Sequence, residues 1–119
     1  MKIKHLAPTL GTLSLKRTIK FYEDNLGFEC VGTYPDAENP CWASLMNGNV
    51  EIMFTTNFKK ISLTGSIYLF VEDVQEIWQQ LQNKVEIVYP LEDLNYGMRE
   101  FGIKDCNGYI LNIGQNIEE

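Results

Sequence analysis

The chain has 119 residues, which predicts a single domain (residues 1–119) with a core large enough to fold without disulfides or metals. Its formal net charge is −6 at pH 7, and an acidic surface argues against nucleic acid as a partner because phosphates would be repelled. No secretory leader is recognisable, and no segment reaches the roughly 18 to 20 apolar residues that span a bilayer. We therefore expect no membrane partner.

The three cysteines, Cys30, Cys41 and Cys106, are an odd number and form no C-x-x-C pair. This usage is typical of reduced thiols in a cytoplasmic protein rather than of a disulfide framework. We expect a cytoplasmic location.

Two segments half a chain apart have the periodicity of amphipathic helices. The first is predicted over residues 15–25, with Ser14 as N-cap and Gly27 as the stop. The second is predicted over residues 74–83, where Asp73 and Glu76 have the spacing of a capping box.

Strands are predicted around these helices, and two Asn-Gly pairs at 47–48 and 107–108 favour hairpin turns between them. The predicted strands cover residues 6–13, 28–34, 41–46, 49–55, 66–71, 85–89, 98–104 and 109–113.

The element order is strand, helix and three strands, and it occurs twice. The two helix caps are 59 positions apart and the two Asn-Gly turns are 60 positions apart, which indicates an internal structural repeat. We expect one module over about 5–56, a linker over 57–64 and a second module over about 65–115.

Two motifs support a family resemblance. The first is the helix ending Phe21-Tyr22-x-x-x-Leu26-Gly27-Phe28. The second lies in the segment 97–109 and reads Gly97-Met98-Arg99-Glu100-Phe101 followed by Asp105-Cys106-Asn107-Gly108-Tyr109. Both resemble motifs of the vicinal-oxygen-chelate superfamily, closest to those of its bleomycin-resistance-like members. The resemblance implies an α+β fold in which two βαβββ modules form a cupped mixed sheet with helices on the convex side. It also implies a homodimer.

Metal-dependent members of this family place four ligands on four strands, two in each module. By position these fall at Ala7, Glu51, Ser66 and Asn112, so one strong ligand is retained. A metal site usually needs at least three protein ligands, so we expect no metal and no cofactor. The single histidine, His5, lies two residues from the Ala7 position, and we interpret it as a solvated or hydrogen-bonded residue rather than a ligand.

Strand alternation assigns the two faces of the sheet. Aliphatic and aromatic residues such as Ile52, Phe54 and Phe101 are predicted to lie under the helices. The opposite face would line the cup as a small-molecule pocket. Its predicted ligand-binding residues are Trp42, Glu51, Tyr68, Glu100 and Asn112, although the same aromatic rings could instead fill the cup as a second core.

These observations predict a metal-free small-molecule-binding protein of the glyoxalase/bleomycin-resistance type, one that sequesters a drug or metabolite. The alternative is a metal-dependent lyase, isomerase or dioxygenase with an atypical ligand set, or a proton-transfer enzyme that uses Glu51. Because no nucleophile and base occur in a recognisable motif, we assign no catalytic residue, and enzymatic activity stays an open question. A protein that acts through a protein partner is a third possibility.

Overall fold

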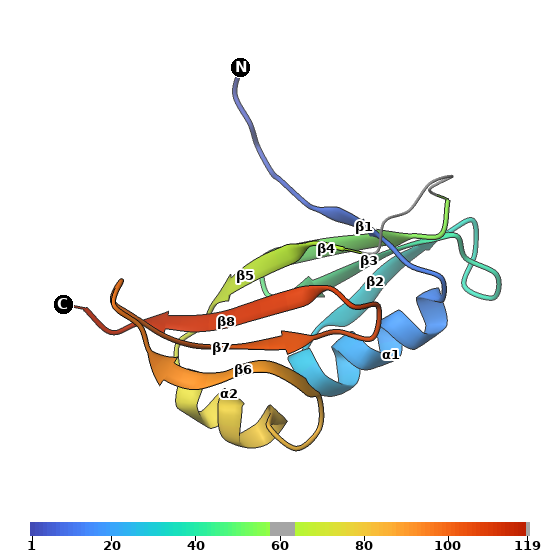
Figure 1. Ribbon diagram of the computed structural model, residues 1–119. Coiled ribbons are helices and arrows are strands. Elements are labelled where there is room, and N and C mark those ends of the chain that lie inside the picture. The colour runs from blue at the N-terminus through green and yellow to red at the C-terminus, as the bar shows by residue number, and fades with distance from the viewer. Residues whose placement is uncertain (58–63, 119) are drawn as a thin grey trace. The chain divides into compact units, whose positions relative to one another are not determined.

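The computed structural model describes residues 1–57 and 64–118, which form two compact units, Met1–Leu63 and Thr64–Glu119 (Figure 1). Each unit contains the order strand, helix, three strands. The predicted linker over 57–64 lies almost entirely outside the described residues. No helix in the described part of the chain is long and apolar enough to cross a lipid bilayer.

Unit one consists of a four-stranded mixed sheet and one helix. Its elements are β1 (Thr9–Gly11), α1 (Leu15–Leu26), β2 (Glu29–Tyr34), β3 (Trp42–Asn47) and β4 (Val50–Thr55). The strand order is β1-β4-β3-β2, with β1 parallel to β4 and the other pairs antiparallel.

Unit two repeats this arrangement. Its elements are β5 (Ser66–Phe70), α2 (Val74–Leu81), β6 (Glu86–Asp93), β7 (Met98–Lys104) and β8 (Ile110–Asn116). The strand order is β5-β8-β7-β6, and β5 is parallel to β8. The predicted α+β fold of two βαβββ modules is therefore confirmed.

In unit one, α1 packs on one face of its sheet through Tyr22. The Tyr22 ring is fully buried and lies 5.0 Å from the ring of Phe54 and 5.5 Å from that of Phe28. The helix begins as predicted, because the Ser14 side chain accepts a hydrogen bond from the Arg17 amide. It ends where Gly27 adopts a positive φ of 69°.

In unit two, α2 packs on its own sheet through Trp78, whose ring lies 5.1 Å from that of Phe101. The predicted capping box is wrong, since the Asp73 side chain makes no capping hydrogen bond. The Val74 amide instead donates to Oε1 of Gln115 on β8, at 3.1 Å. A residue distant in sequence thus satisfies the first orphan amide of the helix.

Three strands differ from the prediction by more than one residue at an end, namely β1, β6 and β8. The first strand is only Thr9–Gly11, because Pro8 has no amide to continue the ladder and the Thr12 side chain starts the turn into α1. β6 continues through Pro90 to Asp93, which is possible because β6 is an edge strand. β8 extends beyond the predicted end to Asn116, paired with Met98 at the start of β7.

Candidate functional site

Each sheet has one face that carries its helix and one face that does not, which we call the helix-free face of that unit. Phe54 contacts α1 and Phe101 contacts α2. Because side chains alternate along a strand, Glu51 and Glu100 lie on the helix-free faces of units one and two. A shift of one residue in register would have reversed this assignment.

The helix-free face of unit two holds a carboxylate bound by three phenols, which we call the Glu100 cluster. Oε1 of Glu100 accepts hydrogen bonds from Tyr68 on β5 at 2.8 Å and from Tyr96, in the loop before β7, at 2.6 Å. Oε2 accepts one from Tyr89 on β6 at 2.7 Å. Glu100 is only 3% exposed, and no ion pair with it occurs among the described residues.

The phenols keep this buried carboxylate charged. Burial by itself raises the pKa of Glu100, but the hydrogen bonds from Tyr96, Tyr89 and Tyr68 outweigh that effect and hold the pKa below its ordinary value of 4.5. The same hydrogen bonds raise the pKa values of the phenols. The bond to Glu100 raises the pKa of Tyr96 to about 12. Burial, followed by the bond to Glu100, raises the pKa values of Tyr68 and Tyr89.

Asn112 on β8 joins the cluster through both ends of its amide. Its Oδ1 lies 2.7 Å from the Tyr89 hydroxyl, and its Nδ2 donates to Ser66 Oγ at 2.5 Å and to the Ile67 carbonyl at 3.1 Å. The structure therefore brings together three of the predicted ligand-binding residues, namely Tyr68, Glu100 and Asn112.

Two glycines make room for the phenols. A Cβ atom on Gly102 would lie 2.2 Å from Cε1 of Tyr89, and one on Gly114 would lie 2.1 Å from the Tyr68 hydroxyl. Both distances are far below van der Waals contact. The absence of side chains at these two positions lets the aromatic rings cross the neighbouring strands and reach Glu100.

The helix-free face of unit one carries the other two predicted residues. Oε1 of Glu51 lies 2.7 Å from Nε2 of His5, and its Oε2 accepts a hydrogen bond from the buried Ser44 hydroxyl. The Ser44 bond and then the His5 bond lower the pKa of Glu51 below its ordinary value. Trp42 lies near the other end of this ladder, where it pairs with Thr55, and its ring packs over Gly32.

The sequence prediction missed two residues of these clusters, Tyr89 and Tyr96, and it did not predict that His5, interpreted as a solvated or hydrogen-bonded residue, contacts Glu51. Tyr89 lies inside the predicted strand 85–89, but simple alternation would place it on the same face as Ile87, and a register shift between Ile87 and Tyr89 turns it to the helix-free face. Tyr96 lies in a loop and His5 lies ahead of β1, so no strand periodicity reports where their side chains point.

The donor atoms do not fit the four-ligand metal site of the wider family. Ala7 has no ligand atom, and both carboxylate oxygens of Glu51 are hydrogen-bonded. The Asn112 oxygen contacts the Tyr89 hydroxyl, and its nitrogen is bonded to Ser66, the fourth position. Among the described residues, no group of three or more His, Cys, Asp or Glu side chains is placed to hold a metal ion.

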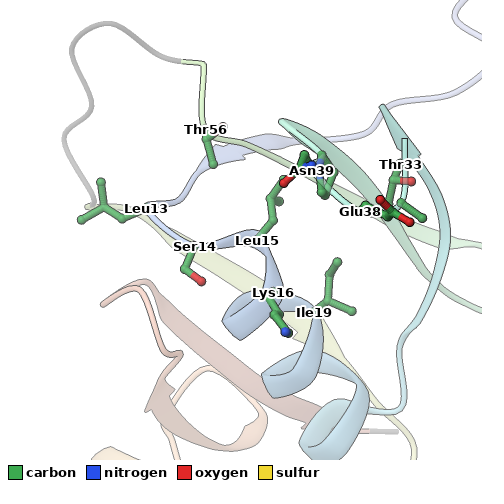
Figure 2. A pocket seen from close by; sticks show the side chains of 11 residues that line it. Leu13, Ser14, Leu15, Lys16, Ile19, Thr33, Glu38, Asn39 and Thr56 are labelled. Carbon is green, nitrogen blue, oxygen red and sulfur yellow. The ribbon is translucent and has the colours of Figure 1, made fainter. Parts of the chain in front are cut away.

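A cavity of about 640 Å³ lies elsewhere in unit one, between the start of α1 and the β2–β3 loop. Figure 2 shows the side chains of Lys16 and Ile19 projecting into it from α1, with Glu38 and Asn39 opposite. None of the five predicted ligand-binding residues lines this cavity.

Three solved structures share the fold over nearly their whole length. TioX from Micromonospora sp. ML1 is 20% identical with a TM-score of 0.83, covering 95% of this chain and 98% of that one. TnmS3, an antibiotic binding protein from Streptomyces sp. CB03234, is 17% identical with a TM-score of 0.82, covering 98% of each chain. A bleomycin resistance determinant encoded on the transposon Tn5 is 23% identical with a TM-score of 0.72, covering 96% and 98%.

Two βαβββ units, each with hydrogen-bonded polar residues on the helix-free face of its sheet, define a chain of the paired-βαβββ class. The family model for the Glyoxalase/Bleomycin resistance protein/Dioxygenase superfamily matches residues 2–113, and the chain belongs to this superfamily. A comparison with curated proteins gives no match.

Proposed function

We propose that this protein is a metal-free, non-catalytic binder of a small molecule, which it holds on the helix-free faces of its sheets. The observation that carries the proposal is the Glu100 cluster, in which a buried carboxylate, three phenols and an amide converge. A few placed polar groups among aromatic rings are the usual composition of a ligand site. Antibiotic binding by TnmS3, a protein of the same fold, is consistent with it.

The proposed ligand-binding residues are Trp42, Glu51, Tyr68, Glu100 and Asn112, and we extend this proposal to Tyr89, whose hydroxyl contacts both Glu100 and Asn112. Trp42 would contribute a stacking surface, and its half-buried ring lies on the same face of β3 as Ser44, the partner of Glu51. Support for a metal-free site comes from the donor set, because Ala7 offers no ligand atom.

A cytoplasmic homodimer completes the proposal. Cys30, Cys41 and Cys106 form no disulfide with one another, which is consistent with a reducing compartment. A symmetric interface should bury on the order of 1,200 Å² in total or more. Light scattering at micromolar concentration tests this part, and a monomer would contradict it.

Native mass spectrometry of the purified protein, followed by a thermal-shift screen of aromatic compounds, tests the binding function. We expect a compound that binds in a ratio of one per chain and raises the melting temperature. Trp42→Ala should weaken its binding by about 1 to 3 kcal/mol, the scale of a stacked aromatic contact. Failure of every compound in a broad aromatic library would contradict the proposal.

One observation favours a metal-dependent enzyme as the second candidate. His5 and Glu51 lie 2.7 Å apart, so two residues of ligand type are adjacent in unit one. Elemental analysis separates the two candidates. Stoichiometric zinc, nickel, manganese or iron that is lost in Glu51→Ala would support the enzyme and refute the metal-free binder.

A further inference from the structure

The Glu100 cluster contains one hydrogen-bonding proton fewer than its contacts require. Four oxygen–oxygen contacts of 2.6 to 2.8 Å connect its members: Tyr68 with Glu100, Tyr96 with Glu100, Tyr89 with Glu100, and Tyr89 with Asn112. Each contact needs one proton between its two oxygens. The three phenols supply three protons for four contacts.

The shortage is located at Tyr89. Its single hydroxyl proton faces two acceptors, Oε2 of Glu100 and Oδ1 of Asn112, each at 2.7 Å. Rotating the Asn112 amide by half a turn would give Tyr89 a donor but would create a new conflict, because the amide oxygen would then lie 3.1 Å from the Ile67 carbonyl oxygen. The contacts of Asn112 with Ile67 and Ser66 thus fix the amide in the orientation that leaves its oxygen toward Tyr89.

A proton on Glu100 would supply the missing donor, but the cluster favours the ionised carboxylate. The phenol hydrogen bonds hold the pKa of Glu100 below its ordinary value, so the group is charged at neutral pH. One acceptor then has no proton, and a buried negative charge has no cation beside it among the described residues. The cluster therefore lacks one hydrogen-bond donor and one positive charge.

We propose that the Glu100 cluster binds a cationic hydrogen-bond donor of the ligand, an ammonium or amidinium group, beside the oxygens of Glu100 and Asn112. The inference rests on the proposed binding function and names the chemistry of its ligand. The cation donates to Oδ1 of Asn112, which leaves the Tyr89 proton to Glu100, and it supplies the positive charge that Glu100 lacks. Tyr96 is 58% exposed, so the cluster has an edge that a ligand can reach.

A titration with benzamidine and benzamide tests this proposal. The two probes have nearly the same shape, but only benzamidine carries a cation, and NMR of isotope-labelled protein reports binding at the Asn112 side-chain amide. We expect saturable binding of benzamidine that is about tenfold or more tighter than that of benzamide, the scale of a charge-assisted hydrogen bond.

Glu100→Gln and Glu76→Gln form a matched pair of variants. Glu76 is exposed and lies on α2, which covers the other face of the sheet, so its variant makes the same change in charge away from the cluster. Glu100→Gln should weaken benzamidine binding by about tenfold or more, whereas Glu76→Gln should change it by less than about threefold because solvent and salt screen an exposed charge. If Glu100→Gln does not fold, Tyr96→Phe takes its place, and benzamidine should bind at least as tightly because a donor that competes for Glu100 is gone.

Equal binding of the two probes, no binding of benzamidine, or equal effects of Glu100→Gln and Glu76→Gln would overturn the cation proposal. Weaker benzamidine binding in Tyr96→Phe would overturn it as well. The binding function itself would survive such a result if a neutral compound from the aromatic screen still bound and shifted the Asn112 resonances. The proposed binding function would be contradicted only if the aromatic screen also gave no bound compound.

Discussion

The Nε2 atom of His5 lies 2.7 Å from Oε1 of Glu51, although 46 residues separate the two in sequence. The contact ties the segment that precedes β1 to the helix-free face of unit one. Ser44 holds the other carboxylate oxygen of Glu51 from the adjacent strand. Glu51 is thus a bridge between three segments of its unit, and its charge state affects all of them.

Replacing Ser44 tests this bridge through pH. The Ser44 hydrogen bond lowers the pKa of Glu51 in the folded state, so its stabilisation is present above the ordinary value of 4.5 and is lost as pH falls through the lower folded-state pKa. Ser44→Ala should therefore lower the thermal midpoint at pH 7, and the difference from wild type should narrow below pH 4.5. Circular dichroism melts between pH 7 and a pH below 4.5 measure the difference in thermal midpoint.

The matched control for that experiment is Ser44→Ala in a Glu51→Gln background. Without a carboxylate, the effect of the serine should no longer depend on acid pH. A Ser44→Ala effect that is independent of pH in the otherwise wild-type chain would show that the hydroxyl acts by packing alone.

Removing one phenol hydroxyl from the Glu100 cluster should destabilise the fold. Tyr68→Phe leaves the buried Glu100 with two donors instead of three, and we expect a loss of about 1 to 2 kcal/mol in the free energy of unfolding. Tyr34→Phe, at an exposed tyrosine, is the control and should have almost no effect. Urea denaturation measures both, and equal values for the two variants would contradict a stabilising role for the hydroxyl.

A methyl group at Gly102 should disturb the cluster by a different route. Its Cβ atom would lie 2.2 Å from the Tyr89 ring, so the ring must move away from Glu100, and overpacking of this kind costs about 1 to 3 kcal/mol. At Gly32, by contrast, the nearest atom would lie at 3.8 Å, which is ordinary contact. Urea denaturation should therefore show a large loss for Gly102→Ala and none for Gly32→Ala. The reverse order would mean that the Tyr89 ring does not occupy this position.

The start of α2 provides a comparison between a local and a distant cap. Gln115→Ala removes the acceptor for the Val74 amide and should cost about 1 kcal/mol, similar to the loss of an N-cap. Asp73→Ala removes a side chain that makes no capping bond, so only a weaker charge effect of a few tenths of a kcal/mol is expected. Thermal melts of Gln115→Ala and Asp73→Ala show which side chain caps α2. A larger loss of stability in Asp73→Ala would favour the capping box.

Local chemistry determined most of the architecture. The periodicity of α1, the Ser14 cap and the positive φ of Gly27 depend on neighbouring residues, and all three were predictable. Period-two alternation likewise assigned Phe54 and Phe101 to the helix-covered faces, because backbone geometry makes successive side chains point in opposite directions. These features need no knowledge of what lies across the sheet.

Tertiary structure decided what the polar residues do. Asp73 has the sequence of a cap, yet Gln115 caps the helix because β8 ends beside it. Tyr89 reaches Glu100 because the β6–β7 register shifts between Ile87 and Tyr89, and Tyr96 reaches it from the loop before β7. His5 reaches Glu51 from a segment without regular structure. Such contacts depend on which strands become neighbours, and a pattern that repeats every two or four residues carries no information about that choice.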